Sequence, residues 1–202
     1  MVGGLTKVGV LASGRGSNLG ALLEQQRLGA LGGEVVVVLT NRPDAPVVEV
    51  ASKYDVPLFT IADPRGQTDA SVLLKGHGVE LVVLAGYDRI LASEFVREWE
   101  GRMINIHPSL LPAFGGGLHA VRDALAYGVK ATGCTVHFVT EDVDAGPIIS
   151  QAAVPVLPDD DEARLAKRIR EKEHQLLPEA VRAYAEGRLT VVGRRVVIEG
   201  SA

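Results

Sequence analysis

Short apolar runs alternate along the first half of the chain with segments whose apolar residues recur at helical spacing. Leu19, Leu22 and Leu23 show this spacing after the first run, and residues 47–51 show it after the second. Strands that are apolar throughout and alternate with helices are typical of a mostly parallel, twisted sheet with both faces covered. The pattern predicts a three-layer α/β/α fold whose strands occupy residues 7–12, 35–40, 58–61, 81–85 and 102–106.

The second half of the chain has a different pattern. Two apolar strands are separated by an acidic loop that is too short for a crossover helix, so we expect an antiparallel addition to the sheet. A long helix is predicted farther on, and Pro178 is expected to break or bend it. The strands are predicted at residues 135–139 and 153–156, the helix at 159–186, and a terminal hairpin at 189–192 and 196–198.

The composition is that of an ordinary globular protein, with 47% hydrophobic and 23% charged residues. We expect one domain over residues 1–202, because no linker or repeat divides the sequence. A net charge of −4 gives no general attraction to nucleic acid or anionic membranes, so we expect neither as a partner. A single cysteine, Cys134, fits a reducing compartment. With no signal-peptide pattern and no long apolar run, these features predict a cytoplasmic protein, either monomer or homodimer.

Asn105 and His107 lie two positions apart at the end of a predicted strand. In an extended strand, residues i and i+2 point to the same face, so both side chains should project together before Pro108 ends the strand. An amide can donate to a developing oxyanion, and an imidazole can move a proton near neutral pH. Alone, this pair fits a polar strand end at least as well as a catalytic centre.

Residues 13–18 (SGRGSN) lie between a predicted strand and a predicted helix. Free backbone N–H groups at a helix start favour a phosphate, and glycines let the loop turn tightly. The loop lacks the Gly-Lys-Ser/Thr of a Walker A motif, and Leu19 stands where a dinucleotide-binding loop has its third glycine. The loop therefore favours a single phosphate over NAD, although an ordinary strand-to-helix turn fits it equally well.

The acidic loop after residues 135–139 carries Asp142 and Asp144. If Asp144 approaches His107, its charge should raise the pKa of the imidazole above the usual value near ~6.5. Solvated turn residues are the alternative reading. The histidines lack metal-ligand spacing, so no metal is expected. A serine hydrolase is also disfavoured, because the sequence has no Gly-x-Ser-x-Gly motif.

Five ordered blocks together resemble the folate-dependent phosphoribosylglycinamide formyltransferases, in their single-domain form. They are VLASGRGSNL, LVVLAGYDRIL, NIHPSLLP, GCTVHFVT and VDAGPI, which start at residues 10, 81, 105, 133 and 143. The resemblance implies a Rossmann-like formyltransferase fold with a phosphate-binding half at 1–100 and a catalytic and folate-binding half at 101–202. It also implies formyl transfer from 10-formyltetrahydrofolate to glycinamide ribonucleotide in purine biosynthesis, without a metal.

The resemblance also assigns site residues. The catalytic trio is Asn105, His107 and Asp144. The ribonucleotide is assigned to Arg15, Gly16, Ser17, Asn18 and Glu173. The folate is assigned to Arg65, Asp88, Arg89, Ile90, Leu91, Asn105, Val139, Thr140, Glu141, Asp142, Val143 and Asp144.

Two positions depart from the family pattern. Residues 115–117 are three glycines where the family has Pro-Gly, so we expect a mobile loop there. Asp88 replaces a residue that is commonly apolar, which puts folate preference in question if its side chain faces the pterin. Related functions remain open: a deformylase, a sugar-nucleotide formyltransferase, or a binding module without activity. A tRNA formyltransferase is disfavoured by the chain length and the lack of basic surplus.

Overall fold

The computed structural model describes residues 4–62 and 69–200. Within these residues, the strands form one nine-stranded sheet. The strands are β1 (Thr6–Leu11), β2 (Gly33–Thr40), β3 (Leu58–Thr60), β4 (Leu81–Leu84), β5 (Met103–His107), β6 (Ala131–Phe138), β7 (Ile148–Pro155), β8 (Leu189–Val192) and β9 (Arg195–Ile198). The helices are α1 (Ser17–Arg27), α2 (Val47–Lys53), α3 (Asp69–Gly76), α4 (Ser93–Glu98), α5 (Ala120–Tyr127) and α6 (Glu162–Ala185).

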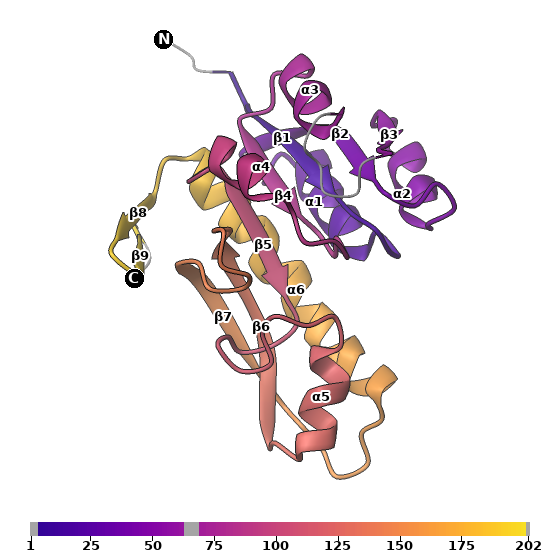
Figure 1. The fold of residues 1–202 in the computed structure, drawn as a ribbon, viewed down its shortest axis with the longest axis vertical. Helices are drawn as coiled ribbons and strands as arrows, with labels where there is room; N and C mark the ends of the chain where they lie inside the picture. Colours follow the sequence, from indigo (N-terminus) through magenta and orange to yellow (C-terminus); the bar gives the residue numbers. More distant parts are fainter. Residues whose placement is uncertain (1–3, 63–68, 201–202) are drawn as a thin grey trace.

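The strand order is β3-β2-β1-β4-β5-β6-β7-β9-β8. The first five are parallel, while β6 runs antiparallel to both of its neighbours, so the predicted antiparallel addition is confirmed. The terminal hairpin is also confirmed and lies to one side of the molecule (Figure 1). The chain moves outward in opposite directions from β1 and β4. In open α/β sheets such a switch point opens a crevice at the carboxyl ends of the strands.

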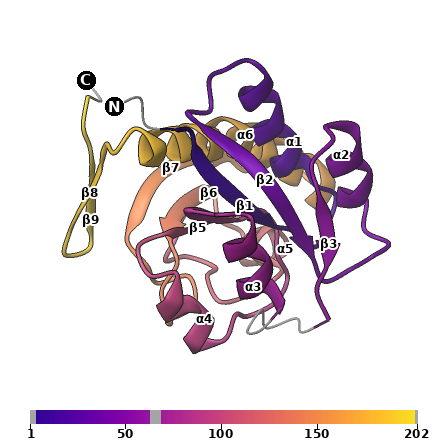
Figure 2. The ribbon, with the colours of Figure 1, turned by 90° about the horizontal axis from the view of Figure 1, so that it is seen from above.

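Helices cover both faces of the sheet, as the three-layer prediction requires. Alternate strand residues face opposite sides: Val83 packs with the helix residues of α1 and α6, whereas Val82 packs with Phe95 and Trp99 at α4. Figure 2 shows α1 and α6 on one side of the sheet and α3 and α4 on the other. Both apolar clusters are buried, so the sheet forms the centre of the core.

Three features differ from the prediction. Of the expected break or bend at Pro178, the break is wrong, because α6 is a single helix of 24 residues that contains Pro178. Leu177 and Val181 on either side are fully buried, and this packing outweighs the backbone hydrogen bond that proline cannot make. The strands β6 and β7 begin four and five residues earlier than predicted, since their first residues include polar side chains. The helices α3, α4 and α5 were not predicted.

No helix in the described part of the chain combines the length and apolar character that crossing a bilayer requires.

Candidate active site

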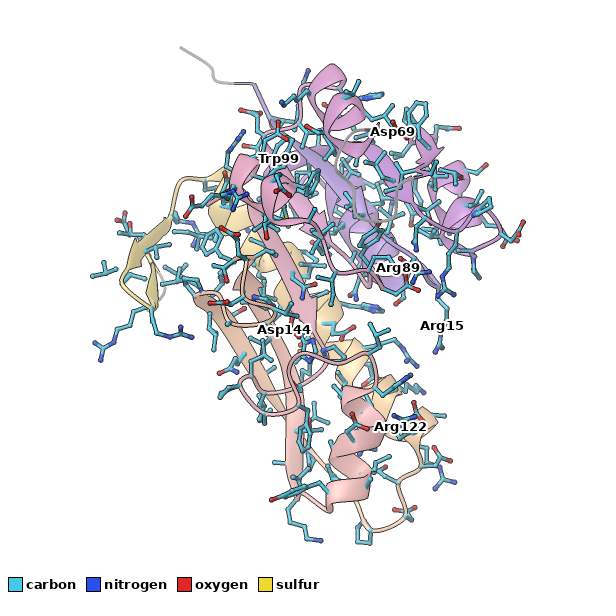
Figure 3. The ribbon with its side chains drawn as sticks, in the orientation of Figure 1. Arg15, Asp69, Arg89, Trp99, Arg122 and Asp144 are labelled. Atoms are coloured by element: carbon cyan, nitrogen blue, oxygen red, sulfur yellow. The ribbon has the colours of Figure 1, made fainter. Side chains whose placement is uncertain are left out.

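Three predicted functional segments meet at the carboxyl ends of the parallel strands: residues 13–18 follow β1, residues 86–91 follow β4, and Asn105 and His107 belong to the end of β5. Because β6 is antiparallel to β5, residues 139–147 leave β6 beside the start of β5, and this loop turns back so that Asp144 reaches His107. Figure 3 shows Asp144 beside the end of β5, with Arg15 and Arg89 at the ends of neighbouring strands. Asp144 of the acidic loop therefore lies at the end of β5, the strand that neighbours β4 at the switch point.

Asp144 lies between two imidazole rings. One carboxylate oxygen, Oδ2, is 3.4 Å from Nδ1 of His107, and the other, Oδ1, is 3.6 Å from Nε2 of His137. The same His137 nitrogen is 3.2 Å from the amide nitrogen of Asn105. Asp144 therefore does approach His107, which is the condition on which the expected pKa shift depends. Asp144 contacts His107 directly, and a fourth side chain, His137, joins Asp144 to Asn105, so all three members of the predicted trio are connected.

The expected direction of the His107 pKa shift is wrong. Burial lowers the pKa of His107, and this effect outweighs the opposing influence of the Asp144 charge and of the Phe114 carbonyl, so the pKa lies below its usual value. The ring is only 6% exposed, and an ion pair does not compensate for so much lost hydration. Nε2 lies 3.1 Å from the Phe114 carbonyl oxygen. The neutral ring is therefore the dominant form at neutral pH.

Asp144 is held in an unusual backbone conformation. Its φ is 53°, in the left-handed region that non-glycine residues rarely adopt. Its Oδ2 accepts a hydrogen bond of 2.8 Å from the backbone N–H of Gly116. Although burial raises the pKa of this carboxyl, His137, the Gly116 N–H and His107 lower it by more, so the pKa lies below its usual value. Asp144 is therefore a charged acceptor beside a neutral imidazole.

Sequence reasoning missed His137 as part of this site and considered it only as a metal ligand. His137 lies in β6 directly opposite Asn105 of β5. Its Nδ1 is 2.8 Å from the Phe138 carbonyl oxygen, which can only accept, so Nδ1 carries the proton. In the neutral ring, Nε2 carries no hydrogen and accepts from the Asn105 amide; in the protonated ring, it donates to Asp144 instead. The sequence contains the histidine but no signal for the register that brings it there.

The glycine loop forms one wall of an open pocket. Gly16 has a φ of 73°, and a Cβ there would lie 2.9 Å from the Val47 backbone, so this turn requires glycine. The helix α1 begins at the next residue and directs its free N–H groups toward the loop. The pocket has a volume of about 220 Å³ and is lined by residues 14–18, 85–86 and 108, by Val121, and by Ala166, Ile169, Arg170 and Glu173.

The predicted ribonucleotide residues Asn18 and Glu173 meet inside this pocket. The Asn18 amide donates a 2.9 Å hydrogen bond to Glu173, which is 6% exposed. Burial raises the pKa of the Glu173 carboxyl above its usual value, despite the opposing Asn18 bond. The other amide atom, Oδ1 of Asn18, is buried and has no partner among the described residues. A ligand that brings a donor would satisfy this oxygen.

The predicted folate residues form two groups. Thr140, Glu141, Asp142 and Val143 lead directly to Asp144, and Val139 is tied to β5 by its N–H, which donates to the Met103 carbonyl. Residues 88–91 follow β4 instead, with Ile90 70% exposed. The Asp88 side chain faces Asn41 and Arg42 rather than open solvent. Arg65 lies outside the described residues.

Comparison with known proteins now decides the family. Residues 6–181 match the family described as formyl transferase. The chain belongs to the formyl transferase family. It is 47% identical over 191 residues to the phosphoribosylglycinamide formyltransferase of Mycobacterium tuberculosis, covering 92% of this chain and 87% of that protein. The trifunctional purine biosynthetic protein adenosine-3 of Drosophila melanogaster is 47% identical over 189 residues, which is 90% of this chain but only 14% of that protein.

Solved formyl transferase structures agree with the fold. The glycinamide ribonucleotide transformylase 1 of Symbiobacterium toebii has a TM-score of 0.90 at 47% identity, over 96% of this chain and 94% of that one. A formyltetrahydrofolate deformylase from Pseudomonas syringae has a TM-score of 0.88 at 32% identity, over 96% of this chain and 66% of that one.

Within residues 4–62 and 69–200, no group of three or more His, Cys, Asp or Glu side chains is arranged to hold a metal ion.

Proposed function

We propose that the protein transfers the formyl group of 10-formyltetrahydrofolate to the amine of N1-(5-phospho-D-ribosyl)glycinamide. The products are N2-formyl-glycinamide ribonucleotide and tetrahydrofolate, a step of de novo purine biosynthesis. The observation that carries this proposal is the cluster of Asn105, His107 and Asp144 next to a pocket suited to an anion. The likeness to phosphoribosylglycinamide formyltransferases over nearly their whole length supports it.

The ribonucleotide phosphate is assigned to the glycine loop. Arg15 supplies a positive charge, and Gly16, Ser17 and Asn18 supply N–H groups at the start of α1. The glycinamide end is assigned to Asn18 and Glu173 at the other side of the pocket. The unpartnered Oδ1 of Asn18 fits a substrate N–H or hydroxyl, and Glu173 can accept a second donor from the same ligand.

The chemistry follows from the protonation states of the cluster. Because Nε2 of His107 faces the Phe114 carbonyl and carries the proton of the neutral ring, Nδ1 is the nitrogen that can accept the proton that the attacking amine loses, relayed by Asp144 or a water. The charged carboxylate of Asp144 then stabilises the imidazolium that forms. The free N–H of the Asn105 amide can donate to the formyl oxygen as negative charge develops on it. The carbon–nitrogen bond to the folate breaks, and the folate nitrogen receives the proton from His107, directly or through water.

The folate is assigned to the two loops on the other side of the cluster. The backbone of Asp88, Arg89, Ile90 and Leu91 would recognise the pterin, and residues 139–144 would cover it. Ile90 and Val143 have exposed apolar side chains that an aromatic ligand can cover. Arg65 stays a predicted folate contact. A cytoplasmic location and a monomeric or homodimeric state stay predictions from the sequence.

The direct test mixes the protein with 10-formyltetrahydrofolate and follows tetrahydrofolate with and without the ribonucleotide. Turnover that depends on the ribonucleotide supports the proposal, and no turnover with both substrates present contradicts it. Turnover that is independent of the acceptor would favour the second candidate, a deformylase, to which one similar structure belongs. We expect His107→Ala and Asp144→Ala each to lower turnover at least ~100-fold with the fold retained, judged by circular dichroism.

A further inference from the structure

A closed ring of hydrogen bonds joins three loops at the switch point of the sheet. The Ser13 hydroxyl donates to Oδ1 of Asn41 at 2.6 Å. The Asn41 amide nitrogen donates to Oδ1 of Asp88 at 2.9 Å. The Asp88 backbone N–H donates back to the Ser13 hydroxyl oxygen at 3.0 Å. The ring therefore links the loops that follow β1, β2 and β4.

The ring is more than a surface contact. Ser13 is 4% exposed and the Asp88 side chain 20% exposed, so its bonds are largely protected from water. The charge of Asp88 is balanced by Arg42, which contacts its second oxygen, and by Arg89 at 3.6 Å. Breaking one bond would leave a partly buried donor or acceptor without a partner, and this penalty exceeds the gain from making the bond.

The loops that the ring joins belong to both proposed substrate sites. Ser13 begins the glycine loop, and its own N–H donates to the Gly86 carbonyl oxygen at 3.1 Å. Asp88 begins the segment assigned to the pterin, and residues 86–92 belong to neither helix nor strand. The position of this segment therefore depends on individual bonds such as the Ser13–Gly86 backbone bond and the side-chain bonds of the ring. Asn41 lies outside the residues that line the pocket and outside residues 88–91, so we assign its contribution to the ring.

We propose that Asp88 and Asn41 are positioning residues that fix the pterin-binding segment against the phosphate loop and so make the binding of the two substrates interdependent. The inference rests on the proposed function. It also explains the departure of Asp88 from the apolar residue common in the family, because the charged side chain turns toward Asn41 and Arg42. By linkage, each substrate then changes the affinity of the other by the same factor.

Titration calorimetry with tetrahydrofolate and glycinamide ribonucleotide tests this inference, because the two together carry no formyl group and cannot react. We expect Asn41→Ala to weaken tetrahydrofolate binding by about threefold or more. In the wild type, saturating ribonucleotide should strengthen tetrahydrofolate binding by at least about threefold, and Asn41→Ala should bring this factor toward one. Asp88→Asn keeps the side-chain shape and should fold even if Asn41→Ala does not. Because this variant loses the charge that Arg42 contacts, the factor by which ribonucleotide strengthens tetrahydrofolate binding should be smaller than in the wild type.

Glu98→Gln is the matched control. Glu98 accepts a 2.6 Å hydrogen bond from Ser71 and pairs with Lys75, so it joins α3 and α4 by a similar network that carries no proposed ligand residue. A purely structural role for Asn41 predicts equal effects of the two variants on folate affinity. Equal effects, an unchanged affinity in Asn41→Ala, or a wild-type factor of one would each overturn the inference while the proposed function stands. A wild-type protein that binds neither ligand would overturn both.

Discussion

Asn105 of β5 lies opposite His137 of β6, and its amide nitrogen is 3.2 Å from the imidazole Nε2. Because Nδ1 of His137 donates to the Phe138 carbonyl, Nε2 of the neutral ring carries no hydrogen and accepts from the amide. This contact fixes which end of the Asn105 amide is the nitrogen, and it leaves the second N–H free to donate. His137 thus acts on the reaction through Asn105.

We expect His137→Leu to lower kcat by about 10- to 100-fold, less than the loss from removing an oxyanion donor outright. The affinity for the ribonucleotide should stay near the wild-type value, because His137 lies outside the pocket lining. Steady-state kinetics with each substrate varied in turn measures both. His77→Leu is the control, since among the described residues its ring bonds the Leu73 carbonyl of α3 and packs against Phe59, away from the site. An unchanged kcat in His137→Leu contradicts this role.

The opposing influences on His107 can be separated by one substitution. Burial lowers the pKa of His107, while the Asp144 charge raises it. Asp144→Asn removes the charge and keeps the shape, so the pKa should fall further below the usual value of about 6.5. Imidazole resonances followed by NMR during a pH titration of the free protein measure this. A wild-type pKa above ~6.5 would show that burial is not the dominant influence, and an increase in the variant would show that the Asp144 charge does not raise the pKa of His107.

Some features of the fold and of the candidate site could be predicted from the sequence, and others could not. The three-layer fold was predictable because each parallel strand is apolar throughout. The trio was assigned through the family resemblance, because its members lie in the blocks that carry that resemblance. The direction of the pKa shift of His107 was not predictable, since it depends on how deeply the ring is buried. The pairing of His137 with Asn105 depends on the register of β5 and β6, and the Asp88 ring depends on three loops meeting. These contacts join segments that are distant in the sequence, and no spacing of residues along the chain predicts them.

Glu173 should make stability depend on pH in the direction opposite to an ordinary ion-paired carboxylate. Its pKa is raised by burial, so the folded state holds its proton to higher pH than the unfolded state does. Its contribution to stability is complete below the unfolded value near ~4.5 and is lost as pH rises through the folded pKa. Glu173→Gln stays neutral and keeps an oxygen that can accept from Asn18.

We therefore expect Glu173→Gln to gain stability relative to the wild type as pH rises from 5 to 8, by about 1.4 kcal/mol for each unit of pKa difference within that window. Urea unfolding at several pH values measures the difference. Glu171→Gln, on the exposed side of the same helix, should show a much smaller dependence. If the two variants follow the same pH profile, burial does not control the titration of Glu173.

The glycines at 116 and 117 offer a matched pair of substitutions. Gly116 has a φ of 76° and donates its N–H to Asp144, whereas Gly117 has an ordinary φ; a Cβ at either position would meet no atom within 4 Å. Gly116→Ala should therefore be disfavoured by backbone strain alone, by about 1–2 kcal/mol if the loop keeps its conformation. Gly117→Ala should be neutral or slightly stabilising, because it restricts the unfolded chain.

The catalytic effect separates strain from the support of Asp144. If the Gly116 N–H helps to hold the carboxylate against His107, Gly116→Ala should lower kcat as well as the free energy of unfolding, while Gly117→Ala should leave kcat near the wild-type value. Hydrogen exchange of the Gly116 amide in the free protein adds an independent measurement. Fast exchange agrees with the predicted mobility of this loop. Strong protection instead would mean that the bond to Asp144 persists before substrate binds, and that the triple glycine is ordered despite its sequence.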